Sequence, residues 1–193
     1  SAPLVGAACV VAEDRVVALD PRAPLVIDTR DLGRRPGAMR TFDVLAPAPA
    51  GLGNDVIGVP EGAELAGRLQ CESVVEGVWM SGTVHAPVRG ECVRCLDPID
   101  TERDFDLQEM FLYQDTHPDD VEAARLQDAL LDLEPTLRDA IVLALPLQPL
   151  CREDCPGLCP ECGVRLADDL DHRHERTDPR WSALAELLND EER

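Results

Sequence analysis

The sequence predicts an α+β protein, built from an antiparallel β-sheet or partly open barrel, one long helix and a Cys-rich region toward the C-terminus. Three observations support this fold class. Apolar and polar residues alternate over residues 64–113, apolar residues recur at helical spacing over 132–145, and four of the eight cysteines fall within 151–162. With 193 residues, of which 45% are hydrophobic, the chain can bury an ordinary core. The order of these patterns predicts two lobes.

We expect a single domain, 1–193, whose lobe over residues 1–115 is mainly β. In this lobe, residues 25–32 predict a strand, 33–40 a loop punctuated by Gly and Pro, and 46–60, rich in Pro, Gly and Ala, a loop or linker. The lobe over 116–193 is expected to hold the helix, a Cys/His-rich segment and a C-terminal helix.

Alternation becomes regular at Glu64 and predicts a strand there, a second from Val78 and a third from Ile99 to Tyr113. The motif Cys92-Val-Arg-Cys95 falls between the second and third strands. We therefore expect this cysteine pair at the tip of a β-hairpin, where half of a zinc ribbon usually sits.

The helix pattern begins at Asp132, which is expected to cap it, with Pro135 in its first turn, and ends before Pro146. The preceding residues, 114–131, are acidic and at best locally helical. Asp178 marks the start of the shorter C-terminal helix, which either packs back onto the domain or binds a partner.

Cysteine and histidine spacing is the strongest chemical signal. Paired cysteines in a chain without secretory features are more often metal ligands or redox thiols than disulfides, and thiolates with imidazoles suit tetrahedral Zn²⁺. Eight candidate donors provide for one or two Zn²⁺ ions and predict a zinc-knuckle C-terminal region. These donors are Cys92, Cys95, Cys151, Cys155, Cys159, Cys162, His172 and His174.

The pairing of these donors stays open in the sequence. One arrangement joins Cys92 and Cys95 to Cys151 and Cys155, leaving the second CxxC motif to His172 and its neighbour. The other places all four cysteines of 151–162 on one ion and leaves the upstream pair as a free dithiol. The two remaining cysteines, Cys9 and Cys71, are expected to be inert small hydrophobic residues.

The charge is strongly acidic, with a net value of −20. Residues 1–96 hold 12 acidic and 9 basic residues, whereas 97–193 hold 26 and 9, and every basic residue is Arg. Most of the surface therefore disfavours nucleic acid. The candidate RNA contacts are one arginine concentration and one arginine of the hairpin tip, namely Arg30, Arg34, Arg35, Arg40 and Arg94.

The sequence does not predict an enzyme. Four-ligand metal sites have no open position for substrate or water, and we find no nucleophile–base pairing or phosphate-cradling loop. No run of eighteen apolar residues and no signal peptide is evident, so we expect a cytoplasmic protein without a membrane or small-molecule partner.

Four blocks occur in order along the chain, namely Gly90-Glu-Cys-Val-Arg-Cys-Leu96, Leu137-Arg-Asp-Ala-Ile-Val-Leu-Ala-Leu-Pro-Leu147, Cys151-Arg-Glu-Asp-Cys-Pro-Gly-Leu-Cys-Pro-Glu-Cys-Gly163 and Asp178-Pro-Arg-Trp181. In these blocks the chain resembles the YceD-like family, also called large ribosomal RNA subunit accumulation proteins. The resemblance covers residues ~70–190, and the region near Asp28 resembles actinobacterial members. Many members have Cys-x-Cys where this chain has His172-Arg-His174, a change that keeps ligand chemistry.

The resemblance implies a factor for 23S rRNA accumulation or processing in large-subunit assembly. It also implies partners, namely 23S rRNA or a large-subunit precursor, with ribosomal protein L32 as a further one because its gene commonly lies beside that of the family member. The alternative function is a thiol or zinc redox sensor in which Cys92 and Cys95 cycle between dithiol and disulfide.

Overall fold

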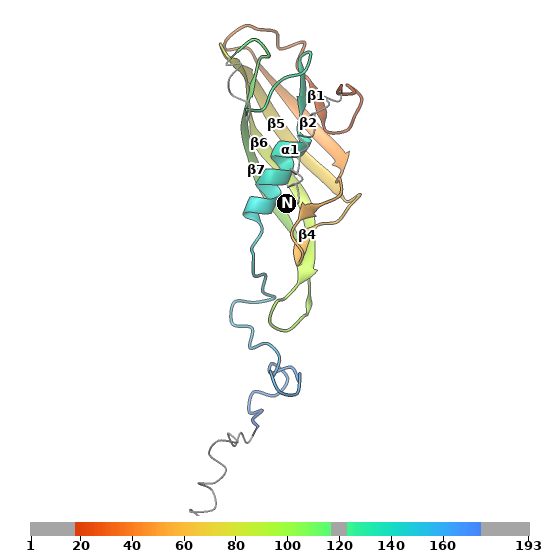
Figure 1. The fold of residues 1–193 in the computed structure, drawn as a ribbon, viewed down its shortest axis with the longest axis vertical. Coiled ribbons are helices and arrows are strands. Elements are labelled where there is room, and N and C mark those ends of the chain that lie inside the picture. The colour runs from red at the N-terminus through yellow and green to blue at the C-terminus, as the bar shows by residue number, and fades with distance from the viewer. Residues whose placement is uncertain (1–17, 117–122, 175–193) are drawn as a thin grey trace, which may run out of the picture.

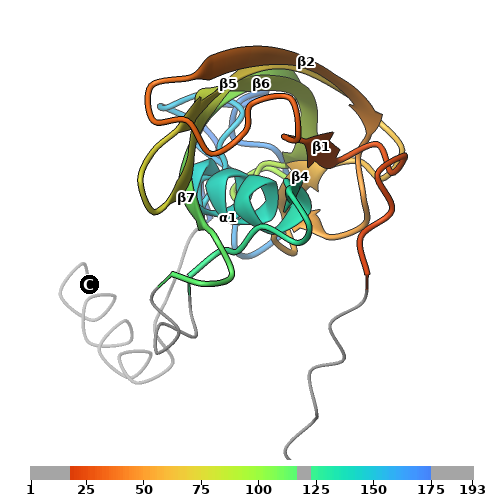
Figure 2. The same cartoon turned by 90° about the horizontal axis from the view of Figure 1, so that it is seen from above.

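The computed structural model describes residues 18–116 and 123–174. Its main feature is a curled antiparallel sheet that forms a half-barrel around one helix, α1 (Figure 1, Figure 2). The strands are β1 Val26–Asp28, β2 Met39–Pro47, β3 Leu52–Gly53, β4 Ile57–Val59, β5 Glu64–Ser73, β6 Gly77–Glu91, β7 Pro98–Leu112 and β8 Leu130–Asp132, and α1 is Glu134–Ala144. The predicted fold class is confirmed.

β6 is the central strand of the sheet. Along one side it pairs with β5 and then with β4, and along the other it pairs with β7 over its whole length, from Gly77 opposite Leu112 to Glu91 opposite Pro98. β2 adds to β5 and β3 to β4, while β1 and β8 form a separate pair. The β6–β7 hairpin extends past the end of α1, and the Cys-rich segment continues beyond its tip (Figure 1).

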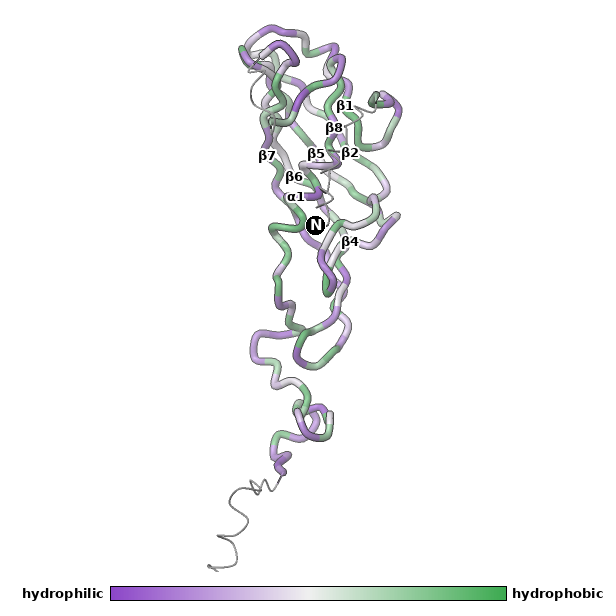
Figure 3. The backbone as a smooth tube through the Cα atoms, in the orientation of Figure 1, coloured by the Kyte–Doolittle hydropathy of each residue, from purple (hydrophilic) through white to green (hydrophobic). Residues whose placement is uncertain are grey.

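Alternation along the three long strands produces the core. Their inward positions are fully buried aliphatic and aromatic side chains, including Leu69 of β5, Met80 of β6 and Phe105 of β7. Outward positions are polar, so that the exposed His85 lies 2.7 Å from the Asp104 carboxylate on the neighbouring strand. The tube in Figure 3 shows both colours along these strands, and the strands predicted between residues 64 and 113 are confirmed.

α1 closes the concave side of the sheet. Leu133, Leu137 and Ile141 are fully buried against it, whereas Leu143 faces solvent. The Asp132 carboxylate accepts a hydrogen bond from the Glu134 N–H at 3.0 Å, although the N-cap residue itself is Leu133. The helix ends at Ala144 because Pro146 disfavours helical geometry in the residue before it. The predicted helix is confirmed within two residues at each end.

The sequence missed β2, which begins inside the predicted 33–40 loop and pairs with nearly all of β5. It also missed β3 and β4 within the predicted 46–60 loop, because strands of two or three residues are too short to show a period. The strand predicted over 25–32 is shorter, since hydrogen-bonded turns follow Thr29.

The described part of 114–131 is not helical. Gln127 and Leu130 exchange backbone hydrogen bonds around Asp128 and Ala129, both at positive φ, which makes a two-residue hairpin leading into β8. The C-terminal helix predicted from Asp178 lies outside the described residues. Among the described residues, no helix is long and apolar enough to span a bilayer. The two-lobe division of the chain stays a prediction.

Candidate metal centres

The first centre begins at the tip of the β6–β7 hairpin, as predicted. Cys92 follows the last residue of β6, and the Leu96 N–H donates to its carbonyl oxygen at 2.9 Å. The Cys92 N–H in turn donates to the Asp97 carbonyl at 2.8 Å. These two bonds close a tight turn that brings Cys95 back beside Cys92.

The segment after α1 is bound to this turn by its backbone. The Val93 N–H donates to the Pro149 carbonyl at 3.0 Å, and the Leu158 N–H donates to the Arg94 carbonyl at 3.0 Å. Gly157 has a φ of +81°, and a Cβ there would lie 3.0 Å from the Arg94 carbonyl oxygen, so a side chain would disturb this contact. The segment therefore lies directly against the hairpin tip.

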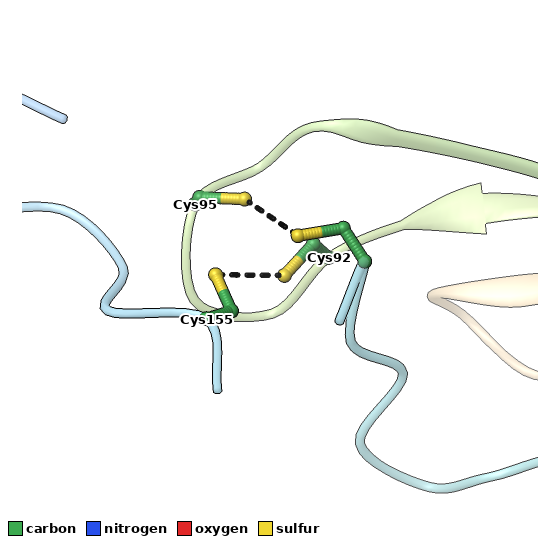
Figure 4. Close-up of side chains that lie close together, drawn as sticks. Cys92, Cys95 and Cys155 are labelled. Atoms are coloured by element: carbon green, nitrogen blue, oxygen red, sulfur yellow. Dashed lines mark hydrogen bonds between the residues drawn. The ribbon is translucent and has the colours of Figure 1, made fainter. Parts of the chain in front are cut away.

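This contact brings four cysteines together. The Sγ atoms of Cys92, Cys95, Cys151 and Cys155 all lie within 4.8 Å of one another, and three of these residues are buried (Figure 4). Sγ–Sγ distances are 3.8 Å for Cys92 and Cys155 and 3.5 Å for Cys95 and Cys151. A tetrahedron with Zn–S bonds of ~2.3 Å has edges of about 3.8 Å. The sulfur positions therefore fit a Cys₄ zinc site.

The second centre consists of Cys159, Cys162, His172 and His174, whose donor atoms also lie within 4.8 Å of one another. Each imidazole Nε2 approaches the Cys162 Sγ, at 3.3 Å for His172 and 3.2 Å for His174. This is a Cys₂His₂ donor set, the other common tetrahedral zinc arrangement. The structure thus favours the first of the two pairings that the sequence left open, with four donors per centre.

Two carboxylates accompany the histidines of the second centre. The Glu161 Oε2 lies 3.5 Å from the His174 Nδ1, and the Asp169 Oδ2 lies 3.8 Å from the His172 Nδ1. In each ring the nitrogen facing the carboxylate is the one that does not face Cys162. Carboxylates in this position orient metal-binding imidazoles and raise their basicity. Sequence reasoning missed both, because acidic residues are common in this region.

Backbone N–H groups prepare some of the sulfurs as thiolates. The N–H groups of Cys162 and Glu161 lower the pKa of Cys159 to about 6. For Cys92, burial raises the pKa, but the N–H groups of Cys151, Cys95 and Arg94 outweigh burial and lower it to about 6. Crowded sulfurs cannot all carry negative charge without a cation, and soft thiolates favour zinc among common divalent metals.

One continuous segment, residues 151–174, contributes donors to both centres. Between them, the Cys159 N–H donates to the Val164 carbonyl and the Leu166 N–H to the Gly157 carbonyl. The Arg165 guanidinium forms an ion pair with Asp97 of the hairpin tip. These contacts fix the position of the second centre relative to the first. Nothing in the sequence pattern indicated this role for Arg165.

The candidate RNA contacts do not form one surface. Four of them lie in residues 30–40, which we call the arginine loop. The Gly37 N–H of this loop donates to the carbonyl oxygen of Ser73, the last residue of β5, which places the loop near the start of β6. Arg94 lies beyond the other end of β6. Arg30 forms an ion pair with Asp28, and Arg34 lies 3.0 Å from the Asp115 carboxylate and stacks over Tyr113. Arg35 and Arg40 are exposed.

Arg94 has a different position from the loop arginines. Its guanidinium donates a 2.9 Å hydrogen bond to the Cys155 carbonyl, which holds the first centre together. Cys71, predicted to be inert, is fully buried in the sheet, and burial raises the pKa of its thiol to about 11. Cys9 lies outside the described residues.

The fold is therefore a half-barrel whose hairpin tip meets a Cys/His-rich segment, with one four-donor cluster at the contact and a second within the segment. The family described as large ribosomal RNA subunit accumulation protein YceD matches residues 80–188, more than half of the chain. The chain belongs to the YceD family. No solved structure matches it.

Curated relatives extend this match beyond the family region. An uncharacterized protein of Mycobacterium tuberculosis is 46% identical over 173 residues, covering 88% of this chain and 84% of the relative. One of Mycobacterium leprae is 39% identical over 172 residues, covering 86% and 78%. The uncharacterized protein YlbN of Bacillus subtilis is 27% identical over 107 residues, covering 52% and 60%. The strongest likeness of these is to the mycobacterial proteins.

Proposed function

We propose that this protein is a non-catalytic cytoplasmic factor that promotes accumulation and processing of 23S rRNA during large-subunit assembly, and that it holds two structural Zn²⁺ ions. The observation that carries the proposal is a pair of closed four-donor Cys/His clusters in a chain of the YceD family. Closed clusters stabilise a surface instead of presenting a reactive metal-bound water. We therefore propose that the protein acts by binding its partners and not by catalysing a reaction.

The first zinc ion joins two parts of the chain that are distant in sequence. It is held by the hairpin tip on one side and by the segment after α1 on the other. Its ligands, Cys92, Cys95, Cys151 and Cys155, supply four thiolates, and no further position is needed for coordination. The ion therefore fixes the direction in which the Cys-rich segment leaves the half-barrel.

rRNA contact is assigned to the arginine loop at the other end of β6. Arg35 and Arg40 are exposed and have no ion pair among the described contacts, which suits phosphate binding. The acidic second half instead suits a basic ribosomal protein such as L32, because complementary charge speeds association and selects partners. The protein thus contacts RNA and protein through different parts of its surface.

The loop assignment is tested with the double variant Arg35→Glu plus Arg40→Glu. We expect its affinity for 23S rRNA to fall ~10–100-fold and the slope of log K against log salt to decrease by about 1–2, since each lost phosphate contact reduces counterion release. The measurement is a filter-binding titration at several salt concentrations.

The matched control is Arg68→Glu plus Arg89→Glu, which makes the same charge change at two exposed arginines on the outer face of the sheet. Control binding that stays within a factor of ~3 of the wild type isolates the loop from net charge. Equal loss in both double variants, or intact binding in the loop variant, contradicts the assignment.

A thiol-based redox sensor is the second candidate function. It is supported by the low pKa of Cys92, which favours the nucleophilic thiolate, and by the Cys95 sulfur, which lies within 4.8 Å of the Cys92 sulfur. Bound zinc protects such thiolates from oxidation. Disulfide formation in zinc-loaded protein under mild oxidant favours this candidate over the structural one.

A further inference from the structure

The two CxxC turns share a closing hydrogen bond and a left-handed residue after the second cysteine, but the identity of that residue differs. In the second turn, the Gly163 N–H donates to the Cys159 carbonyl at 2.9 Å, with Gly163 at a φ of +73°. In the first, the Leu96 N–H donates to the Cys92 carbonyl at 2.9 Å, with Leu96 at a φ of +61°. A leucine thus occupies the left-handed position that favours glycine.

The packing of the first centre gives no reason for this leucine. The apolar residues that pack around its cysteines are Ile99, Leu150 and Leu158. Leu96 is not among them and is 61% exposed. Left-handed backbone in a residue with a Cβ is unfavourable, and here no burial offsets it within the described chain. Leu96 therefore presents an apolar side chain to solvent in an unfavourable backbone conformation, and contact with a partner would bury that side chain.

The neighbouring residues indicate the charge of that partner. Val93, in the same turn, is 40% exposed and adds apolar surface. Glu91 lies before this turn, and Glu153 and Asp154 follow Cys151 in the adjoining segment; all three are exposed acidic residues. Arg152 is also exposed, and it lies 3.4 Å from the Asp154 carboxylate, which leaves Glu91 and Glu153 without an ion pair among the described contacts. Arg94 is directed to the Cys155 carbonyl. An apolar point among acidic groups repels phosphates and attracts a basic polypeptide.

We propose that Leu96 and Val93 form a docking point for an apolar side chain within a basic segment of a large-subunit ribosomal protein. The identity of that protein class rests on the proposed function, whereas the docking point rests on the Leu96 geometry. Truncating a side chain that becomes buried at an interface lowers affinity, and complementary charge around it helps to select the partner. The hairpin tip is therefore a protein-binding end, opposite the arginine loop.

The test compares zinc-loaded wild-type chain with Leu96→Gly and Leu96→Asn. Glycine and asparagine both accept left-handed backbone, so each variant keeps the turn and removes the apolar side chain. The chain has no lysine, so an amine-reactive dye labels only its N-terminus. The labelled chains are titrated, by fluorescence anisotropy, with rRNA-free total protein of the large subunit and separately with protein-free 23S rRNA.

We expect both variants to lose at least ~10-fold in affinity for the ribosomal proteins, with rRNA affinity unchanged. Relief of the backbone conformation should also raise the melting temperature of Leu96→Gly by about 2–4 °C. The matched control is Val75→Ser, because Val75 is 81% exposed in the turn at the opposite end of β6. This control should bind as the wild type does.

Unchanged protein affinity in both Leu96 variants overturns the docking point while leaving the proposed function intact. Wild-type chain that binds neither probe overturns the proposed function and, with it, the partner. Loss of rRNA affinity in the Leu96 variants assigns the tip to RNA and overturns the inference. If the wild-type chain self-associates and both Leu96 variants abolish this, the occupant is a second copy of the chain. If both variants have a lower melting temperature, Leu96 packs within its own chain. Either result overturns the inference.

Discussion

Replacing Cys155 by Ser is expected to release one of the two zinc ions and to detach the Cys-rich segment from the hairpin tip. The amides of Val93 and Leu158 donate across this contact, and their hydrogen exchange should accelerate at least ~100-fold, because a structural zinc contributes on the order of 10 kcal/mol to the part it closes. Exchange in β5 and β7 should stay slow, since their core is independent of the metal. Hydrogen exchange followed by mass spectrometry measures both regions in one experiment.

His174→Ala is the control for this variant. It also removes one ion, but from the second centre, which does not bridge the two segments. Val93 and Leu158 should therefore remain protected in this variant. Rapid exchange at these amides in His174→Ala, or full protection in Cys155→Ser, contradicts the claim that the first centre joins the hairpin tip to the segment after α1.

Replacing Leu137 by Ala is expected to have the largest effect on global stability. Leu137 is fully buried between α1 and the sheet, and shortening it removes apolar contact and leaves a cavity. Such substitutions cost about 2–5 kcal/mol. For a chain of this length the melting temperature should fall by roughly 5–15 °C, measured by circular dichroism on zinc-loaded protein.

Leu143→Ala provides the same chemical change on the same helix at a position that is 84% exposed. Its free energy of unfolding should stay within ~0.5 kcal/mol of the wild type. Equal destabilisation by the two substitutions is incompatible with α1 packing through its Leu137 face.

Periodicity predicted the elements that bury one face. β5, β6, β7 and α1 each combine enough residues with a regular apolar spacing to be recognised without a structure. β2 was not predicted because its sequence mixes Pro, Ala and charged residues, and its strand geometry depends on pairing with β5. Tertiary pairing of this kind leaves no local signal.

Cysteine spacing predicted the eight candidate donors, but it did not fix how they pair. Pairing depends on how far the β6–β7 hairpin extends and on where the segment after α1 meets its tip, both of which are properties of the folded chain. The carboxylates of Glu161 and Asp169 and the role of Arg94 depend on the same arrangement. The left-handed conformation of Leu96 is likewise a property of the folded turn that its sequence does not reveal.

Native mass spectrometry of protein purified without chelators tests the two-zinc scaffold most directly. The prediction is a mass that corresponds to two bound zinc ions, with thiol titration under the same conditions finding the six donor cysteines, Cys92, Cys95, Cys151, Cys155, Cys159 and Cys162, unreactive. Protein that carries no zinc contradicts the central claim. A single zinc with reactive Cys92 and Cys95 contradicts the pairing and favours the redox function.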